Sequence, residues 1–291
     1  MGIKVLLLNI DSKLPNIALK KIERWHEQQG DEVTWDMPMM LNQTDKAYAS
    51  CIFTRNAKVV ANYKGLYPEL IAGGTGYDLT RKLPPEIEDI KLRINLGFTT
   101  RGCPRHCPFC LVPEAEGGIK VIGDINDLWD GRSKSITLLD NNILAAPEHF
   151  IKICRQVRDK NLVVDFNQGL DIRLITRELA ECLGSIKTFD VRFAFDFPGM
   201  EAVIRQKIKM LRTVKKFQNK HFFFYVLVGF NTTFEQDLHR LDVLRELRCR
   251  PYVMRHEDTP KEQRYIELAR WVNQMWTFST FDFGEFSKLG D

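Results

Sequence analysis

The chain has 291 residues, 44% of them hydrophobic, which is enough to bury one large core or the cores of two domains. Its 42 basic and 38 acidic residues give a net charge of +4, which permits a nucleic-acid partner without arguing for one. No apolar run approaches the ~20 residues that span a bilayer, and residues 5–8 form too short a run for a signal peptide. Seven cysteines, four of them isolated, indicate a reduced cytoplasmic protein rather than a disulfide scaffold.

The N-terminal part alternates between strand and helix patterns, which predicts a small parallel α/β domain over 1–88, similar to Rossmann and flavodoxin folds. Residues 78–88, which contain two consecutive prolines, are predicted to be a linker. The helix is expected at 17–29, and the strands at 3–9, 32–36, 48–54 and 69–76.

From residue 94 the alternation restarts, which predicts a second domain over 89–258. Six strands with helical crossovers fit a partial (β/α)6 TIM-like barrel, because a closed eight-unit barrel needs ~250 residues. A C-terminal segment, 259–291, carries a helix and an aromatic run that is expected to pack as a lid over the exposed barrel edge. Strands are expected at 94–98, 135–139, 162–166, 190–195, 222–228 and 250–254, and helices at 147–159, 176–183, 201–217 and 233–247.

Three cysteines, Cys103, Cys107 and Cys110, fall within eight positions on one loop. Three thiolates can hold three irons of a four-iron cluster and leave the fourth iron open, whereas electron carriers use four cysteines. The alternatives are a chance grouping or a structural zinc site completed by His106 or Cys51. Zinc sites usually consist of two ligand pairs, and the sequence offers no second pair.

The spacing Cys-x3-Cys-x2-Cys, with Phe109 before the last cysteine, resembles the signature of the radical S-adenosylmethionine (radical SAM) enzymes. Residues 99–113 are similar to the branch that contains cobalamin-domain members and methylthiotransferases, and the resemblance covers roughly 94–254. It implies a [4Fe-4S] cluster on Cys103, Cys107 and Cys110, with S-adenosylmethionine on the open iron and Phe109 beside the adenine. It also implies oxygen sensitivity, a reductase such as flavodoxin or ferredoxin, and a 5'-deoxyadenosyl radical that abstracts hydrogen from substrate.

Polar residues follow the expected barrel strands, at the end where barrel chemistry takes place. Asp140, Asn141 and Asn142 follow the strand at 135–139, where the family often has a Gly-Gly-Glu type motif that holds the methionyl amino group. The sequence departs from that motif but still offers an acceptor for an ammonium group. The alternative is an ordinary polar turn between strand and helix.

The strand at 162–166 is followed by Asn167, Gln168, Asp171 and Arg173. Asn167 and Gln168 are expected to reach ribose hydroxyls, and Arg173 to bind a carboxylate in a bidentate manner. The alternative is an ion pair of Arg173 with Asp171 or with Asp196.

Asp196 and Gly229 follow the next two strands. The family commonly has Ser or Glu at the place of Asp196, and Gly229 resembles the glycine turn that approaches the adenine. Three further residues at the end of the sixth strand are Tyr252, Met254 and Arg255, which are expected to face substrate. His256 beside them is either a proton donor or a lone surface histidine.

The substrate, whether a small molecule, a peptide or a nucleic acid, is not encoded in these motifs. Methylthiotransferases carry three more N-terminal cysteines, and this chain has only Cys51 there. Cobalamin-dependent methylation is disfavoured because the Asp-x-His-x-x-Gly motif is missing and His26 is the only N-terminal histidine.

The glycine turn at 73–76 could bind a phosphate, but a single glycine turn is weak evidence for such a site. A zinc-stabilised nucleic-acid-binding protein, with basic strings at 207–212 and 215–216, is the alternative of another class.

Overall fold

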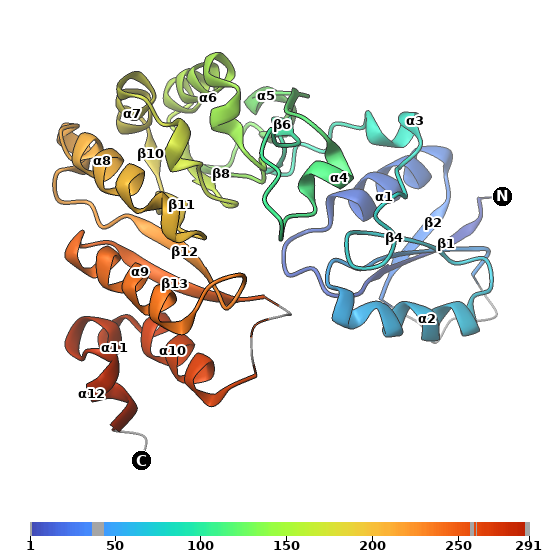
Figure 1. Ribbon diagram of the computed structural model, residues 1–291. Helices are drawn as coiled ribbons and strands as arrows, with labels where there is room; N and C mark the ends of the chain where they lie inside the picture. Colours follow the sequence, from blue (N-terminus) through green and yellow to red (C-terminus); the bar gives the residue numbers. More distant parts are fainter. Residues whose placement is uncertain (1, 37–43, 257–258, 260, 289–291) are drawn as a thin grey trace. The chain divides into compact units, whose positions relative to one another are not determined.

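The computed structural model describes residues 2–36, 44–256, 259 and 261–288, and it is a mixed α/β structure with parallel sheets (Figure 1). The chain divides into two compact units. Unit 1 comprises 1–97, 114–116 and 126–131, and unit 2 comprises 98–113, 117–125 and 132–291. Within the described ranges no helix is long and apolar enough to cross a membrane.

Unit 1 contains a fully parallel four-stranded sheet with the order β2-β1-β3-β4. Alternate residues of β1 point to opposite faces: Leu6 and Leu8 pack with Val60, whereas Val5 and Leu7 pack with the first helix. The sheet is therefore covered on both faces, as is usual for parallel sheets. The elements of unit 1 are β1 (Lys4–Asn9), α1 (Ile17–Gln29), β2 (Glu32–Trp35), β3 (Lys46–Ser50), α2 (Ala57–Leu66), β4 (Ile71–Gly73), α3 (Pro85–Glu88) and β5 (Leu96–Gly97), of which β5 lies outside this sheet.

Local signals explain why α1 has the predicted bounds. The side chain of Asn16 accepts a hydrogen bond from the Leu19 amide at 3.1 Å, which caps the helix start. Gly30 ends the helix in the left-handed region, with φ of 82°.

Several predictions for unit 1 are corrected by the structure. The third strand ends at Ser50 rather than at residue 54, because residues 54–56 form a 3-10 turn that leads into α2. The sequence pattern missed α2, of which Val60 is the buried member. The fourth strand is confined to Ile71–Gly73, and the predicted linker at 78–88 contains the short helix α3.

Unit 2 contains two parallel sets of strands with helices between them, ordered β10-β9-β8 and β11-β12-β13. Helices α6 to α9 lie along one side of these strands in Figure 1. The strands are β8 (Ser135–Leu138), β9 (Val163–Phe166), β10 (Lys187–Thr188), β11 (Arg192–Ala194), β12 (Phe223–Val228) and β13 (Arg250–Arg255). The helices are α6 (Pro147–Asp159), α7 (Arg177–Gly184), α8 (Glu201–Leu211), α9 (Phe234–Glu246), α10 (Gln263–Asn273), α11 (Met275–Thr280) and α12 (Phe283–Lys288).

The strand predicted at 190–195 is confined to Arg192–Ala194 in the structure, and the short strand that precedes it, Lys187–Thr188, was not predicted. Residues of β10 pair with β9, whereas β11 pairs with β12. The segment between them continues both ladders, since the amide of Phe189 donates to Val164 and the carbonyl of Val191 accepts from Phe223. A second correction concerns the helix predicted at 201–217, which ends at Leu211 and is followed by a 3-10 turn at Lys215–Phe217.

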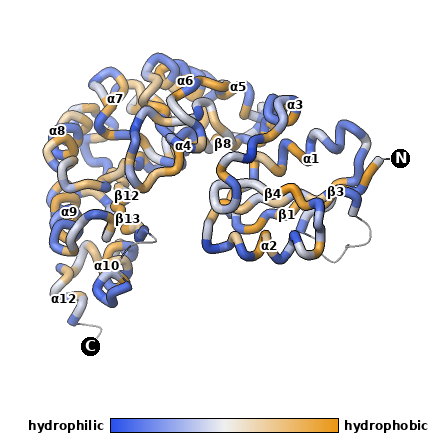
Figure 2. Tube along the Cα trace, turned by 45° about the vertical axis from the view of Figure 1, so that its right-hand side comes forward, coloured by the Kyte–Doolittle hydropathy of each residue, from blue (hydrophilic) through white to orange (hydrophobic). Residues whose placement is uncertain are grey.

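One face of the unit 2 strands is apolar and buried against the helices. It carries one buried residue from each of five strands: Ile136, Val164, Phe193, Phe224 and Val253. The helices present apolar residues to this face and polar residues away from it, so the tubes of α6 and α7 alternate in hydropathy in Figure 2.

The C-terminal segment lies beside the last strand. The side chain of Asn273, at the end of α10, accepts from the Val253 amide at 2.7 Å and donates to its carbonyl at 3.1 Å. These bonds occupy backbone groups of β13 that would otherwise remain open at the sheet edge. The predicted aromatic run forms α11 and the start of α12, with Phe278 packed on Trp271 at 5.1 Å between ring centroids.

Candidate active site around the cysteine loop

The cysteine loop leaves a short antiparallel hairpin that pairs β6 (Thr100–Arg101) with β7 (Lys120–Val121). Gly102 follows β6 with φ of 81°, and a Cβ atom there would lie 2.3 Å from the carbonyl oxygen of Gly118. Only glycine fits this position, both for its backbone conformation and for its packing. The Cys103 amide then donates to the Gly117 carbonyl at 3.0 Å, which fixes the start of the loop. The loop ends in α4 (Val112–Glu116), and α5 (Ile125–Leu128) follows the hairpin.

The three thiols are half-buried and near one another. Burial raises the pKa values of the Cys107 and Cys110 thiols, and neighbouring cysteines and Asp196 add to the increase. Arg173 opposes the increase at Cys107, to which it also donates a hydrogen bond. The sulfur of Cys103 accepts from the Arg105 amide and from Nδ2 of Asn142, both at 3.4 Å.

The donor set agrees chemically with a bound iron–sulfur cluster. Thiolates at these positions repel one another, and bound iron would remove that cost. Two buried oxygens near the loop, Oδ1 of Asn142 and Oδ2 of Asp140, also make no hydrogen bond. No three His, Cys, Asp or Glu side chains among the described residues have converged into a metal site. The loop therefore brings three thiols of suitable chemistry near one another, Cys103, Cys107 and Cys110, but they are not arranged as a complete set of metal ligands.

The three residues after β8 have three different environments. Asp140 is 4% exposed, and its Oδ1 accepts from the backbone and the hydroxyl of both Thr99 and Thr100. Burial raises its pKa in spite of these bonds. Asn141 accepts from the Gly102 amide at 3.0 Å. Asp140 and Asn141 therefore hold the strand that leads into the loop, and Asn142 is the residue that contacts a cysteine.

Asp171 gathers two arginines beside the cysteine loop. It is bound in a bidentate manner by Arg173, at 2.7 Å and 2.9 Å, and by Nε of Arg105 at 3.0 Å. Burial of Asp171 opposes its ionisation, but the two arginines outweigh burial and lower its pKa. The ion pair of Arg173 with Asp171, predicted as the alternative to carboxylate binding, is therefore present. Arg105 joins it from the loop itself, which the sequence did not indicate.

Asp196 lies at the end of β11 and faces the same site. Its Oδ1 accepts from the Leu227 amide at 3.3 Å, and burial raises its pKa although Arg240 and Arg173 oppose the change. Asp196 in turn contributes to the raised pKa values of Cys107 and Cys110. The site therefore contains a half-buried carboxyl next to the cysteine loop.

A buried ion pair on α9 holds the ends of β11 and β12. Asp237 and Arg240 are both fully buried and lie 2.5 Å apart. Arg240 donates to the carbonyls of Phe195 and Leu227, and Asp237 accepts from the Gly229 amide at 2.8 Å. Gly229 was predicted from the sequence, but this pair was not; its signal is Asp and Arg at i,i+3 in the helix after the Gly229 turn.

Phe109 lies in an aromatic group whose members come from different strand ends. Its ring centroid is 5.6 Å from that of Phe197 and 5.7 Å from that of Phe230, and Phe230 contacts His256 at 4.6 Å. Phe197, Phe230 and His256 follow β11, β12 and β13 respectively. His256 is thus part of an aromatic contact, and a flat apolar surface lies next to the cysteine loop.

Other predicted residues lie further from this group. Gln168 is exposed and donates to Asn167 at 3.4 Å. Tyr252, Met254 and Arg255 are exposed along β13. Among the described residues no hydrogen bond or ion pair links them to the cysteines.

The strand ends of unit 1 are occupied by its own side chains. Asp11 accepts from the amides of Ile52 and Phe53 at 2.8 Å and 3.0 Å, so these donors are not available to a phosphate. A Cβ atom at Gly74 would lie 2.3 Å from the Cys51 carbonyl oxygen, so this glycine serves close packing. The ring of His26 is buried and bonds to Asp31 and to Tyr48 through its two nitrogens.

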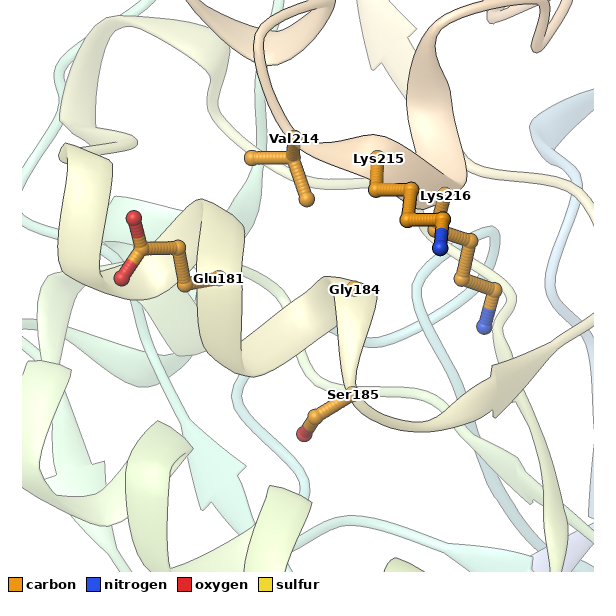
Figure 3. Close-up of a pocket in the computed structure, with 6 residues that line it drawn as sticks. All are labelled: Glu181, Gly184, Ser185, Val214, Lys215 and Lys216. Carbon is orange, nitrogen blue, oxygen red and sulfur yellow. The ribbon is translucent and has the colours of Figure 1, made fainter.

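A cavity of 620 Å³ lies elsewhere in unit 2, between the end of α7 and residues 214–216 (Figure 3). None of its six lining residues is a predicted site residue. It is close to the amino ends of the strands, whereas the cysteine loop and its partners follow carboxyl ends.

The comparisons with known proteins add no relative. No protein-family model matches the chain, and the search of curated proteins also finds no match. The functional interpretation therefore depends on the residues of the site and their arrangement.

Proposed function

We propose that the protein is a radical SAM enzyme whose unit 2 is a partial (β/α)6 barrel. The observation that carries the proposal is the convergence on the Cys103–Cys110 loop of side chains from successive strand ends: Asn142, Asp171, Arg173 and Asp196. Parallel strands that alternate with helices along one of their faces support the barrel. When bound, the [4Fe-4S] cluster and S-adenosylmethionine would supply the radical chemistry: with one electron from a reductase they would give methionine and a 5'-deoxyadenosyl radical that could take a hydrogen atom from substrate.

The chain's own residues would bind and orient the cofactor. Cys103, Cys107 and Cys110 would hold three irons, and Arg173 would stabilise the thiolate of Cys107. The free Oδ1 of Asn142 is a buried acceptor suited to an ammonium group. Phe109 with Phe197 and Phe230 would give the adenine an apolar surface and exclude water.

Asp140 takes a supporting role in this proposal. Four donors already occupy one of its oxygens, so it would fix Thr99 and Thr100 and leave Oδ2 for the cofactor. Gln168 is exposed, and its contact with a ribose hydroxyl of the cofactor stays a prediction. Cobalamin stays disfavoured, because His26 uses both ring nitrogens within unit 1.

Anaerobic reconstitution with iron and sulfide tests the proposal. We expect a brown protein with about four irons per chain, as for a cysteine-ligated cluster. With S-adenosylmethionine and dithionite it should then release 5'-deoxyadenosine. Cys107→Ala should lose both the cluster and the product.

Cys182→Ala is the matched control, because Cys182 is a half-buried cysteine on α7, outside the loop. It should retain the iron content and product yield of the wild type. A colourless protein that retains one zinc after reconstitution would contradict the proposal. A coloured protein with equal yields from Cys107→Ala and the wild type would contradict the assignment of the ligands.

A further inference from the structure

The face of the unit 2 strands opposite the helices is mixed, because polar and aromatic side chains stand on it beside apolar ones such as Leu227 and Met254. Alternate residues on this open face are Thr137, Asp165, Arg192, Tyr225 and Tyr252, one from each of five strands, and all are half-buried or exposed. Parallel sheets are normally covered by apolar contacts on both faces. Polar and aromatic side chains on one face indicate that this face contacts a ligand.

Three aromatic rings of the open face lie together. Tyr252 is stacked on Phe223 at 6.1 Å between centroids, and Tyr225 contacts Phe223 at 5.2 Å and Tyr252 at 6.2 Å. Tyr252 remains 42% exposed. A ring with one free surface on a rigid strand is a platform on which a planar group can stack.

A 340 Å³ cavity adjoins this platform. Phe189 and Arg192 line it, together with the carboxylates of Asp165 and Asp190. Arg192 pairs with Asp165 and lies 3.9 Å from Asp190, which limits the negative charge of the cavity. Phe189 is 51% exposed and adds a further ring. Arg192 is also the register partner of Phe223, so cavity and platform are continuous.

Basic side chains surround the segment that carries Phe189. Lys187 bonds to Asn161, Lys216 to the Ile186 carbonyl and Lys220 to the Phe189 carbonyl. In the described parts of the chain none of these three lysines makes an ion pair with a carboxylate. The pKa of Lys216 is lowered by burial and by the charge of Lys220, so the positive charges are close. Such a cluster favours an anion.

The cavity of Figure 3 adds to the same basic region. Lys215 and Lys216 extend from one segment in the same general direction, with Glu181 across the hollow. Glu181 is engaged by Arg177 at 2.7 Å. The sequence order explains this grouping, since Lys187 begins β10 and residues 215–220 precede β12. Parallel strands bring their amino ends to one edge.

We propose that the open face and this amino edge bind single-stranded nucleic acid. Bases would stack on Tyr252 and Phe223, and the backbone phosphates would contact Lys187, Lys215 and Lys220. Aromatic platforms beside a basic groove are the usual means of binding single strands without sequence preference. The inference goes beyond the proposed function and needs no cluster, because the cysteine loop follows the carboxyl ends of the strands.

Fluorescence anisotropy with a labelled mixed-sequence single strand, as RNA and as DNA, tests the proposal on the full chain purified without a cluster. We expect binding that weakens with salt by a slope of about −0.7 per phosphate contact. Tyr252→Ala should weaken it roughly ten-fold, and Tyr252→Phe should retain it. Lys220→Gln should reduce the salt slope by about 0.7.

Arg158→Gln is the control, because Arg158 is an exposed arginine on α6 that lies outside this face. It should bind like the wild type. Because Tyr252 is exposed, circular dichroism of Tyr252→Ala should match the wild type. The proposal would be overturned by the absence of binding at low salt, by equal affinity of Tyr252→Ala and the wild type, or by equal affinity for a duplex, which cannot stack its bases on the platform.

Discussion

Asp171 joins three parts of the candidate active site. It binds Arg105 of the cysteine loop and Arg173 after β9, and it lies 3.5 Å from Nδ2 of Asn142 after β8. Its side chain is 7% exposed, so these charge-assisted bonds are shielded from water. One carboxylate therefore fixes the loop with respect to two strand ends.

Asp171→Asn should lower the free energy of unfolding by about 1–3 kcal/mol, because two arginines lose their charged partner. The folded-state pKa of Asp171 is lowered, so its contribution is complete above its unfolded value of about 3.9 and disappears as pH falls through the folded value. The difference between wild type and variant should be constant near pH 7 and shrink below about pH 4. Denaturant unfolding across this range measures it.

Asp159→Asn is the control for this prediction. Asp159 pairs with Arg158 at 3.8 Å on the exposed side of α6, where ion pairs contribute little. It should change stability by less than about 0.5 kcal/mol at any pH. If Asp159→Asn and Asp171→Asn lowered the free energy of unfolding equally, the change in net charge rather than the contacts of Asp171 would explain the loss.

At the scale of elements, α9 does more than cover the sheet. The side chains of Asp237 and Arg240 lie buried between α9 and the strands and form hydrogen bonds with backbone groups at the ends of β11 and β12. These ends carry Asp196 and Gly229. The helix therefore positions two strand ends of the candidate site by hydrogen bonds as well as by apolar packing.

Arg240→Ala should destabilise unit 2 by about 3–5 kcal/mol, because it leaves Asp237 buried without a partner. Two carbonyls lose their donor as well. Arg177→Ala, at a 60% exposed pair on α7, should cost at most about 1 kcal/mol. Guanidinium unfolding of the two variants compares them, and similar midpoints would contradict the role of the buried pair.

Some helix and strand bounds could be predicted from the sequence, and others could not. The bounds of α1 and α6 agree with prediction because periodic apolar residues and terminal signals coincide there. The hairpin of β6 and β7 was missed, since two-residue strands carry no periodicity and are defined by their partner. The strand β10 was missed for a related reason, because two residues carry no periodicity and this strand is defined by its pairing with β9.

For the molecule as a whole, the sequence was enough to predict the central residues of the candidate site but not the residues that surround and support them. The cysteine spacing and the polar strand ends are local, and they pointed to Cys103, Asn142, Asp171 and Asp196. Thr99 and Thr100, which bind Asp140, and Phe230, which contacts Phe109, are distant in sequence from their partners. Only the tertiary structure brings such residues together.

The two units also differ in what their strand ends can do. In unit 2 the strand ends present buried and half-buried polar side chains to the cysteine loop. In unit 1, Asp11 binds the amides of Ile52 and Phe53 and the side chain of Asn56, so the same edge is filled from within. We therefore expect unit 1 to support the structure and unit 2 to carry the chemistry.

Asp11→Asn tests this division. Burial acts against ionisation of Asp11, but Asn56 and the two amides outweigh it and lower its pKa. The carboxylate therefore stabilises unit 1 above about pH 4, and its loss should cost about 1–3 kcal/mol at pH 7 and less as pH falls.

Hydrogen exchange of the backbone amides in Asp11→Asn should become faster in β1 and β3 but not in β12 and β13. The control Glu27→Gln, at an exposed pair, should leave the exchange rates of both sets of strands unchanged. Iron content and 5'-deoxyadenosine yield should equal those of the wild type, and a loss of either would mean that the unit 1 strand ends contribute to the active site.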